Sequence, residues 1–214
     1  MRSGCVGIVV FVLASLLMAS GPPFPGQGVD VLDASEPIPY FIADGSGVPG
    51  WEPSDQELAS TALEAWSRES RGRLRFVPAS EDEALIRVVW VSAEQGLFGE
   101  MRRFRLNGRT GALVFVRPDV DQLGPALAAR SSRDPLLRET IVYLTSVHEL
   151  GHAVGLPHTR NFKDIMYSFA YGGDIVEYFL RYRRELRSRE DIQLHSGLSP
   201  SDRETLRLLY EVGK

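Results

Sequence analysis

Cysteine is nearly absent from this chain of 214 residues, and the single one, Cys5, lies close to the N-terminus. One cysteine excludes an intramolecular disulfide, and its position leaves no thiolate for a metal site farther along the chain. An excess of positive charge is lacking as well, since the formal net charge is -4. Such a chain has no overall attraction to phosphate backbones or anionic membranes, so we expect no nucleic-acid partner, and no stable membrane association unless an N-terminal signal stays uncleaved.

Low-complexity tracts and internal repeats are also missing, and the main long apolar run, residues 6–19, lies at the N-terminus. A length of 214 residues with 43% hydrophobic side chains suits one folded domain with a sizeable core better than two. We therefore expect a single folded domain over residues 36–214, and we expect it to be a monomer.

The N-terminus has the pattern of a secretory signal. Arg2 precedes the apolar run, which ends in small residues and a pair of prolines. This order predicts a signal peptide over residues 1–21 and export of the chain to the periplasm or the extracellular space. The run is not far short of the roughly 20 residues that span a bilayer, so an uncleaved membrane anchor is the alternative. Residues 22–35, which begin rich in proline and glycine, are expected to form a flexible linker.

The first half of the domain combines one helix with several strands. Ser54 and Glu57 form a capping-box pattern, and apolar residues at helical spacing follow, which predicts a helix over residues 55–70. Asn107 and Gly108 form a typical hairpin turn between two β-rich runs. The segments expected as strands are residues 38–42, 74–77, 84–91, 101–106 and 112–116.

Helices dominate the second half. Asp134 and Pro135 are typical of a helix start, and apolar residues on two faces predict a buried central helix that ends near Val154. Residues 174–192 are predicted to form a further helix, in which arginines alternate with acidic residues and favour a solvated face. Ser199 is expected to begin the cap of a last helix.

Three histidines have the spacing of a metal site. His148 and His152 are four residues apart, so on a helix their imidazoles lie on one face, within reach of one cation. Gly155 can adopt the positive φ that ends a helix and reverses the chain, which brings His158 back as a third ligand. Three histidine ligands leave one position of tetrahedral zinc for water, as in catalytic sites.

Glu149 directly follows the first of these histidines. Hydrolysis of a peptide bond needs a group that takes a proton from zinc-bound water and later delivers one to the leaving amine, and a carboxylate here can do both. The alternative is a helix with solvated histidines, because short patterns of this kind recur by chance. The chain has only four histidines, so three of them in this extended pattern favour a catalytic zinc site.

The run HELGHAVGLPH at residues 148–158, with Asp-Ile-Met-Tyr at residues 164–167, resembles the metzincin peptidases and, among them, the matrixins. The resemblance implies that Met166 forms a methionine turn beneath the zinc. Metzincins with a tyrosine ligand carry it one position later than Tyr167, where this chain has Ser168. Tyr167 is therefore expected to be a pocket-wall or packing residue.

The same resemblance implies an α+β fold of the metzincin kind. We expect a twisted mixed β-sheet of four to five strands with an active-site helix, a backing helix and a C-terminal helix. The hairpin around residues 101–116 should supply an antiparallel edge strand along which an extended peptide lies. Arg102, Arg103 and Arg105 are expected to shape substrate preference if they flank this cleft.

Two further features of matrixins are not expected here. A propeptide cysteine that caps the zinc has no counterpart, because Cys5 is the only cysteine. A second, structural zinc needs additional histidines, and only His195 remains, which we expect to be a surface or loop residue. One catalytic Zn²⁺ ion is therefore predicted. Asp119 and Asp121 are too few for a calcium site, so Ca²⁺ is an unsupported alternative.

Together these inferences predict a zinc metalloendopeptidase that hydrolyses peptide bonds of exported or extracellular proteins. The predicted site consists of the base Glu149, the ligands His148, His152 and His158, and the supporting residues Gly155 and Met166. An exopeptidase is a weaker prediction, because no group that recognises a terminal charge is evident. A non-catalytic zinc-binding module is a second alternative, against which the presence of Glu149 argues. A membrane-tethered processing enzyme is the third, and it depends on whether residues 1–21 are retained.

Overall fold

The computed structural model describes residues 31–95 and 98–211. The predicted signal peptide at residues 1–21 lies outside these ranges, as does most of the predicted linker. Leu32, however, is 1% exposed and belongs to the hydrophobic core. The prediction of a flexible linker over residues 22–35 is therefore wrong at its C-terminal end, because an apolar side chain there is buried in the core.

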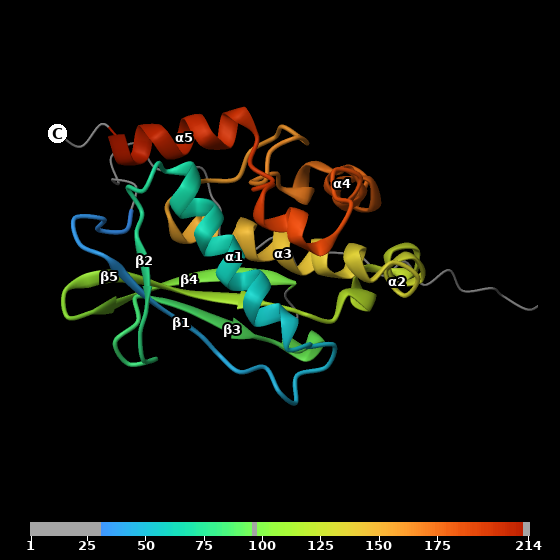
Figure 1. Ribbon diagram of the computed structural model, residues 1–214, viewed down its shortest axis with the longest axis horizontal. Helices are drawn as coiled ribbons and strands as arrows, with labels where there is room; N and C mark the ends of the chain where they lie inside the picture. Colours follow the sequence, from blue (N-terminus) through green and yellow to red (C-terminus); the bar gives the residue numbers. More distant parts are fainter. Residues whose placement is uncertain (1–30, 96–97, 212–214) are drawn as a thin grey trace, which may run out of the picture.

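Five strands form one mixed sheet (Figure 1). They are β1 (Ile38–Ile42), β2 (Phe76–Pro78), β3 (Ile86–Trp90), β4 (Gly99–Leu106) and β5 (Arg109–Val116). Their order is β2-β1-β3-β5-β4, and neighbouring strands are parallel except for the antiparallel pair of β5 and β4. The α+β class, the mixed sheet and the predicted number of strands are confirmed.

β4 is the antiparallel edge strand that the sequence led us to expect. It pairs with β5 along all of its 8 residues. Asn107 and Gly108 connect the two strands with φ angles of 51° and 80°. Asparagine and glycine tolerate such left-handed φ angles better than other residues, which is why this dipeptide reverses the chain here.

The helices α1, α3, α4 and α5 lie on one side of the sheet (Figure 1). The α-helices are α1 (Ser54–Glu69), α2 (Pro125–Ser131), α3 (Pro135–Ala153), α4 (Ile175–Arg183) and α5 (Pro200–Glu211). α3 contacts β4 and β5, while α1 packs along α3 as the predicted backing helix. No helix in the described part of the chain is long and apolar enough to cross a membrane.

α3 runs through the centre of the molecule. Its start is set by Asp134, whose carboxylate accepts a hydrogen bond from the Leu137 N–H, and by Pro135 at the first helical position. Trp66 of α1 is fully buried and donates its indole N–H to the Val147 carbonyl of α3 at 3.0 Å. The buried central helix is therefore confirmed, and α1 is fixed to it one residue before His148.

The predicted capping box at the start of α1 is wrong. Ser54 is the first helical residue, and Pro53 holds the cap position without a side-chain hydrogen bond. The buried Asp55 carboxylate instead accepts a hydrogen bond from the Glu52 N–H at 3.0 Å and forms an ion pair with Arg138 of α3. A tertiary ion pair thus determines the geometry of this helix start, and the local pattern of Ser54 does not reveal it.

The single helix predicted over residues 174–192 is also wrong. α4 ends at Arg183, and a separate 3₁₀ turn, capped by Ser188, follows at Arg189–Gln193. The partly buried Arg183 guanidinium binds the Asp134 carboxylate at 2.8 Å, which ties the end of α4 to the start of α3. Arg183 and Arg189, which the alternating charge pattern assigned to a solvated face, therefore bind neighbouring elements.

Candidate metal centre

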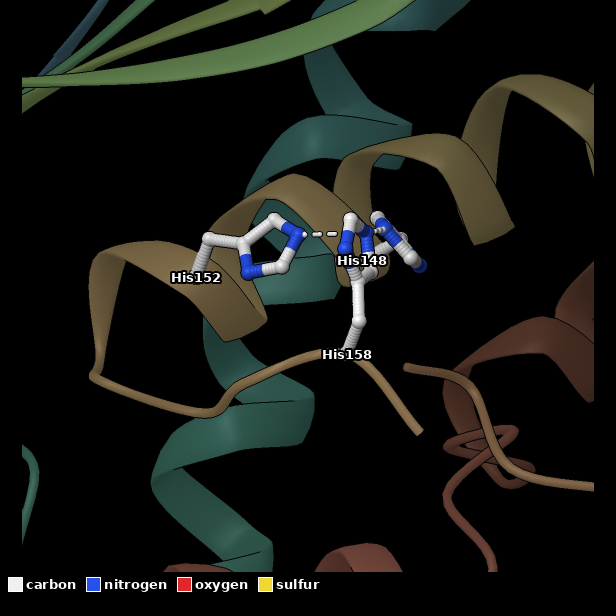
Figure 2. Close-up of side chains that lie close together, drawn as sticks. All are labelled: His148, His152 and His158. Atoms are coloured by element: carbon white, nitrogen blue, oxygen red, sulfur yellow. Dashed lines mark hydrogen bonds between the residues drawn. The ribbon is translucent and has the colours of Figure 1, made fainter. Parts of the chain in front are cut away.

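Three imidazoles meet at the C-terminal end of α3 (Figure 2). His148 and His152 lie one turn apart on the same face of the helix. Gly155 has a φ of 103°, which ends the helix and lets the chain return with His158. The Nε2 atom of His158 lies 3.2 Å from Nε2 of His148 and 3.0 Å from Nε2 of His152. The structure therefore brings together the three histidines that the sequence singled out.

Backbone carbonyls determine which ring nitrogens face this centre. His148 Nδ1 lies 2.6 Å from the Ile165 carbonyl oxygen, and His152 Nδ1 lies 2.9 Å from the Leu156 carbonyl oxygen. A carbonyl oxygen can only accept, so each Nδ1 carries the proton and donates it. Nε2 of a neutral ring then carries a lone pair, and both of these lone pairs point towards Nε2 of His158.

This donor set fits a zinc ion. Lone pairs gathered so closely repel one another unless a cation lies among them. Tetrahedral coordination with Zn–N distances of about 2.0–2.1 Å places two ligand nitrogens roughly 3.3 Å apart. The observed separations of 3.2 and 3.0 Å are close to that value. Metal-binding histidines commonly donate their other ring N–H to a carbonyl, as His148 and His152 do here.

Burial keeps the three rings neutral. It lowers the pKa of His148 to about 3 and that of His152 to about 4, and the neighbouring histidines act in the same direction. Burial lowers the pKa of His158 as well. Because a metal binds the neutral imidazole, the three side chains are ready to act as ligands near neutral pH.

The carboxylate of Glu149 lies between α3 and the edge strand β4. The residue is 7% exposed, and its carboxylate touches the backbone of Gly99, the first residue of β4. Burial and, to a smaller extent, the charge of Glu100 raise the pKa of Glu149 to about 8. A carboxyl group with a pKa near neutrality can take up and release protons at physiological pH.

Met166 lies directly beneath the histidine helix. A β-carbon on Gly151 would stand 2.9 Å from Cζ2 of Trp66 and still closer to Sδ of Met166, so only glycine fits between them. The N–H of Thr159, which follows His158, donates to the Met166 carbonyl at 2.8 Å. Met166 is fully buried. The turn expected from the metzincin resemblance is thus in place under the three histidines.

Asp202 supports the same turn, although the sequence did not suggest it as a site residue. Its buried Oδ2 accepts hydrogen bonds from the N–H groups of Ile165 and Ser199, both at 2.8 Å. The Ile165 carbonyl in turn accepts from His148. The run Ser-Pro-Ser-Asp predicts a helix cap, correctly, since the Ser199 hydroxyl accepts from the Asp202 N–H at 3.1 Å. That local pattern carries no sign that the carboxylate also reaches Ile165.

Tyr167 is a packing residue, as predicted. It is 5% exposed, and its hydroxyl donates to the Gly172 carbonyl at 2.9 Å. Its ring meets the edge of Phe162 with centroids 5.2 Å apart. Because its hydroxyl is bound to Gly172, Tyr167 does not act as a metal ligand in this arrangement.

The remaining candidate ligands lie elsewhere. His195 Nδ1 is 3.9 Å from a carboxylate oxygen of Glu185. Asp119 accepts a hydrogen bond from the Asp121 N–H and forms no larger acidic group. Across residues 31–95 and 98–211, the three histidines are the one group of three or more such side chains close enough to share an ion.

The three arginines of β4 differ in what they contact. Arg102 binds Glu100 through two hydrogen bonds and lies over the ring of Phe115. Arg105 donates to the Gly108 carbonyl at the hairpin turn. Arg103 turns towards α3. The expectation that all three shape substrate preference therefore has no support from Arg103, whose guanidinium is engaged inside the molecule.

This fold and this site together define a zinc metalloendopeptidase. Comparison with protein families agrees: residues 51–176 match the family model described as Matrixin. The match covers more than half of the chain and includes α1, the strands β2 to β5, α3 and Met166. The chain belongs to the matrixin family. A search among curated proteins found no match.

Proposed function

We propose that this matrixin is an exported endopeptidase in which His148, His152 and His158 hold one catalytic zinc ion and Glu149 is the base. The convergence of three Nε2 atoms carries this proposal, because the spacing of 3.0 and 3.2 Å suits a shared zinc and leaves a fourth position open. Its substrates are the peptide bonds of proteins or peptides.

When bound, zinc polarises the scissile carbonyl and makes a water molecule more acidic. The chain itself moves the protons. Glu149 accepts a proton from the attacking water and later donates one to the leaving amide nitrogen. Burial favours this double role, because the raised pKa keeps the proton affinity of the carboxylate close to that needed at neutral pH. A bound cation opposes part of that shift, which leaves Glu149 ionised and ready to act as base.

The free edge of β4 is the proposed binding site of the substrate backbone. Within residues 31–95 and 98–211, β4 ends the strand order, so its outer N–H and C=O groups have no strand partner there. An extended peptide can add there as a further strand, held by main-chain hydrogen bonds. Such binding recognises no chain terminus, which supports an endopeptidase over an exopeptidase.

Export is supported by the basic, apolar and small-residue pattern of residues 1–21. Cleavage of this segment would release a soluble enzyme, and retention would give a membrane-tethered one. Mass spectrometry of the N-terminal peptide of the exported protein separates the two forms. A start between residues 20 and 30 supports cleavage, whereas an intact Arg2 peptide supports the anchor.

The function is tested by incubating the purified protein with unfolded casein and identifying new termini by mass spectrometry. Glu149→Gln removes the base and keeps the size of the side chain. We expect this variant to retain zinc and to lose cleavage by a factor of about 10² to 10⁴. Glu64→Gln, at an exposed position of α1, is the matched control and should cleave normally. Stoichiometric zinc without cleavage by the unaltered protein would favour the non-catalytic module.

A further inference from the structure

Arg103 links the edge strand to the last turn of the metal-binding helix. From β4 its guanidinium reaches α3, where Nη1 donates to the Ala153 carbonyl at 2.6 Å and Nη2 donates to the His152 carbonyl at 3.0 Å. The side chain is partly buried. One of the two acceptors thus belongs to a residue whose imidazole faces the metal centre.

The end of α3 needs such donors. The last carbonyls of a helix have no partners within it, and they carry the negative end of the helix dipole. Gly155 donates its N–H to the His152 carbonyl, but the reversal at Gly155 also ends the helix and leaves no further turn. The planar fork of arginine can bind two adjacent carbonyls at once, which the single ammonium group of lysine cannot match.

A second side chain binds the same helix end from another direction. The Tyr210 hydroxyl of α5 donates to the Val154 carbonyl at 2.9 Å. Three consecutive carbonyls, from His152 to Val154, are therefore held by side chains of β4 and α5. This end of α3 is fixed from two sides, directly next to the residues that carry the imidazoles.

We propose that Arg103 is a positioning residue that fixes the metal-binding end of α3 relative to the substrate strand β4. Through its two hydrogen bonds it sets both the orientation of His152 and the spacing between the bound peptide and the metal. This role rests on the proposed function, in which β4 binds the peptide. It differs from substrate recognition, because the guanidinium donates to backbone carbonyls of α3.

The test compares Arg103→Met, which keeps the length of the side chain and removes its donors, with Arg103→Lys. Arg133→Met is the matched control: the Arg133 guanidinium also binds a helix carbonyl, that of Ala129 in α2, away from the histidines. For each variant we would measure the zinc dissociation constant with a competing chelator dye, kcat and KM separately, and the free energy of unfolding in urea.

We expect Arg103→Met to weaken zinc binding and to lower kcat, each by about tenfold or more, as losses next to metal ligands commonly do. Arg103→Lys should recover part of both, and Arg133→Met should change neither by more than about twofold. The zinc constant does not depend on peptidase activity, so it tests Arg103 even if the unaltered protein cleaves nothing.

Two results would overturn the proposal. If Arg103→Met lost only stability in urea, with the zinc constant and kcat of the folded protein unchanged, Arg103 would be an ordinary helix cap. If it raised only KM, Arg103 would contact the substrate.

Discussion

The carboxylate of Glu149 rests on the α-carbon of Gly99, at the point where the edge strand β4 begins. A β-carbon at Gly99 would stand 2.9 Å from both Cγ and Cδ of Glu149 and closer still to Oε1. Contacts of this length do not occur between a real β-carbon and its neighbours. The base can hold its position only because the first residue of the strand has no side chain.

Gly99→Ala should therefore displace the Glu149 carboxylate without removing it. We expect kcat to fall by about 10- to 100-fold, since a displacement near 1 Å at a catalytic group has effects of this size. The zinc dissociation constant should stay unchanged, because the three heavy atoms nearest to the added methyl group all belong to Glu149. Steady-state kinetics and zinc titration of the same preparation check both statements.

A double variant provides the control for this contact. In a Glu149→Ala background the clash is gone, so adding Gly99→Ala should cause no further loss of activity and a smaller loss of stability than in the unaltered protein. Additive losses in the double variant would show that Gly99→Ala acts on something other than Glu149.

The metal-free protein should become less stable as the pH rises from 7.5 to 9. Glu149 loses its proton near pH 4.5 when unfolded and near pH 8 when folded. The folded state thus holds more protons in this window, and raising the pH favours unfolding. We expect the free energy of unfolding in urea to fall by about 0.8 kcal/mol across the window after chelation of the metal. His148, His152 and His158 contribute little in this window, because a full unit above their ordinary pKa of 6.5 they are almost entirely neutral in either state.

Below pH 6.5 the histidines give the free energy of unfolding a pH dependence of the opposite sign. Their pKa values are depressed to about 3 and 4 in the fold, so the unfolded chain takes up protons first and the metal-free protein loses stability as the pH falls. Glu149→Gln should abolish the fall between pH 7.5 and 9 and keep this loss in acid. An unchanged slope on the alkaline side in Glu149→Gln would assign it to another group.

Asp202→Ala should destabilise the methionine turn. It leaves the buried N–H groups of Ile165 and Ser199 without their acceptor, which costs about 1–3 kcal/mol for each group left unpaired. Burial raises the pKa of Asp202, while the hydrogen bonds from Ile165 and Ser199 lower it. Asp202→Asn keeps an acceptor oxygen and should lose much less in urea denaturation. Equal losses in the two variants would contradict this assignment.

Gly155→Ala should weaken the metal site through the backbone. A φ of 103° is strained for alanine, at a cost of about 1–2 kcal/mol, and relief of that strain would move His158 away from the other histidines. Gly47→Ala introduces similar strain at a φ of 92°, in a loop with no atom near the added methyl group. Both variants should lose stability, and only Gly155→Ala should lose zinc affinity. Equal zinc affinity in both would show that Gly155 does not position His158.

Much of the site is visible in the sequence because its parts are close in the chain. The four-residue spacing of His148 and His152 needs only a helix, and the return of His158 needs only a glycine that can take a positive φ. The hairpin at Asn107 and Gly108 is equally local. Each of these predictions depends on backbone geometry within a few residues, and each is confirmed by the structure.

The errors concern contacts between distant residues. Asp55 meets Arg138, 83 positions away, and this pair overrides the capping pattern of Ser54. Arg183 binds Asp134 across 49 positions, where alternating charges predict a continuous solvated helix. Asp202 reaches Ile165 in the same manner, 37 positions away. Local patterns carry no information about such partners, because the partners are determined by how the elements pack.

Zinc removal and return test the central claim most directly. The protein would be stripped with a chelator, dialysed and titrated with Zn²⁺, while bound zinc and casein cleavage are recorded together, with His158→Ala beside it. We predict that the stripped protein is inactive, that cleavage returns in proportion to bound zinc up to one ion per chain, and that His158→Ala recovers neither. Undiminished cleavage by the fully stripped protein would contradict the account.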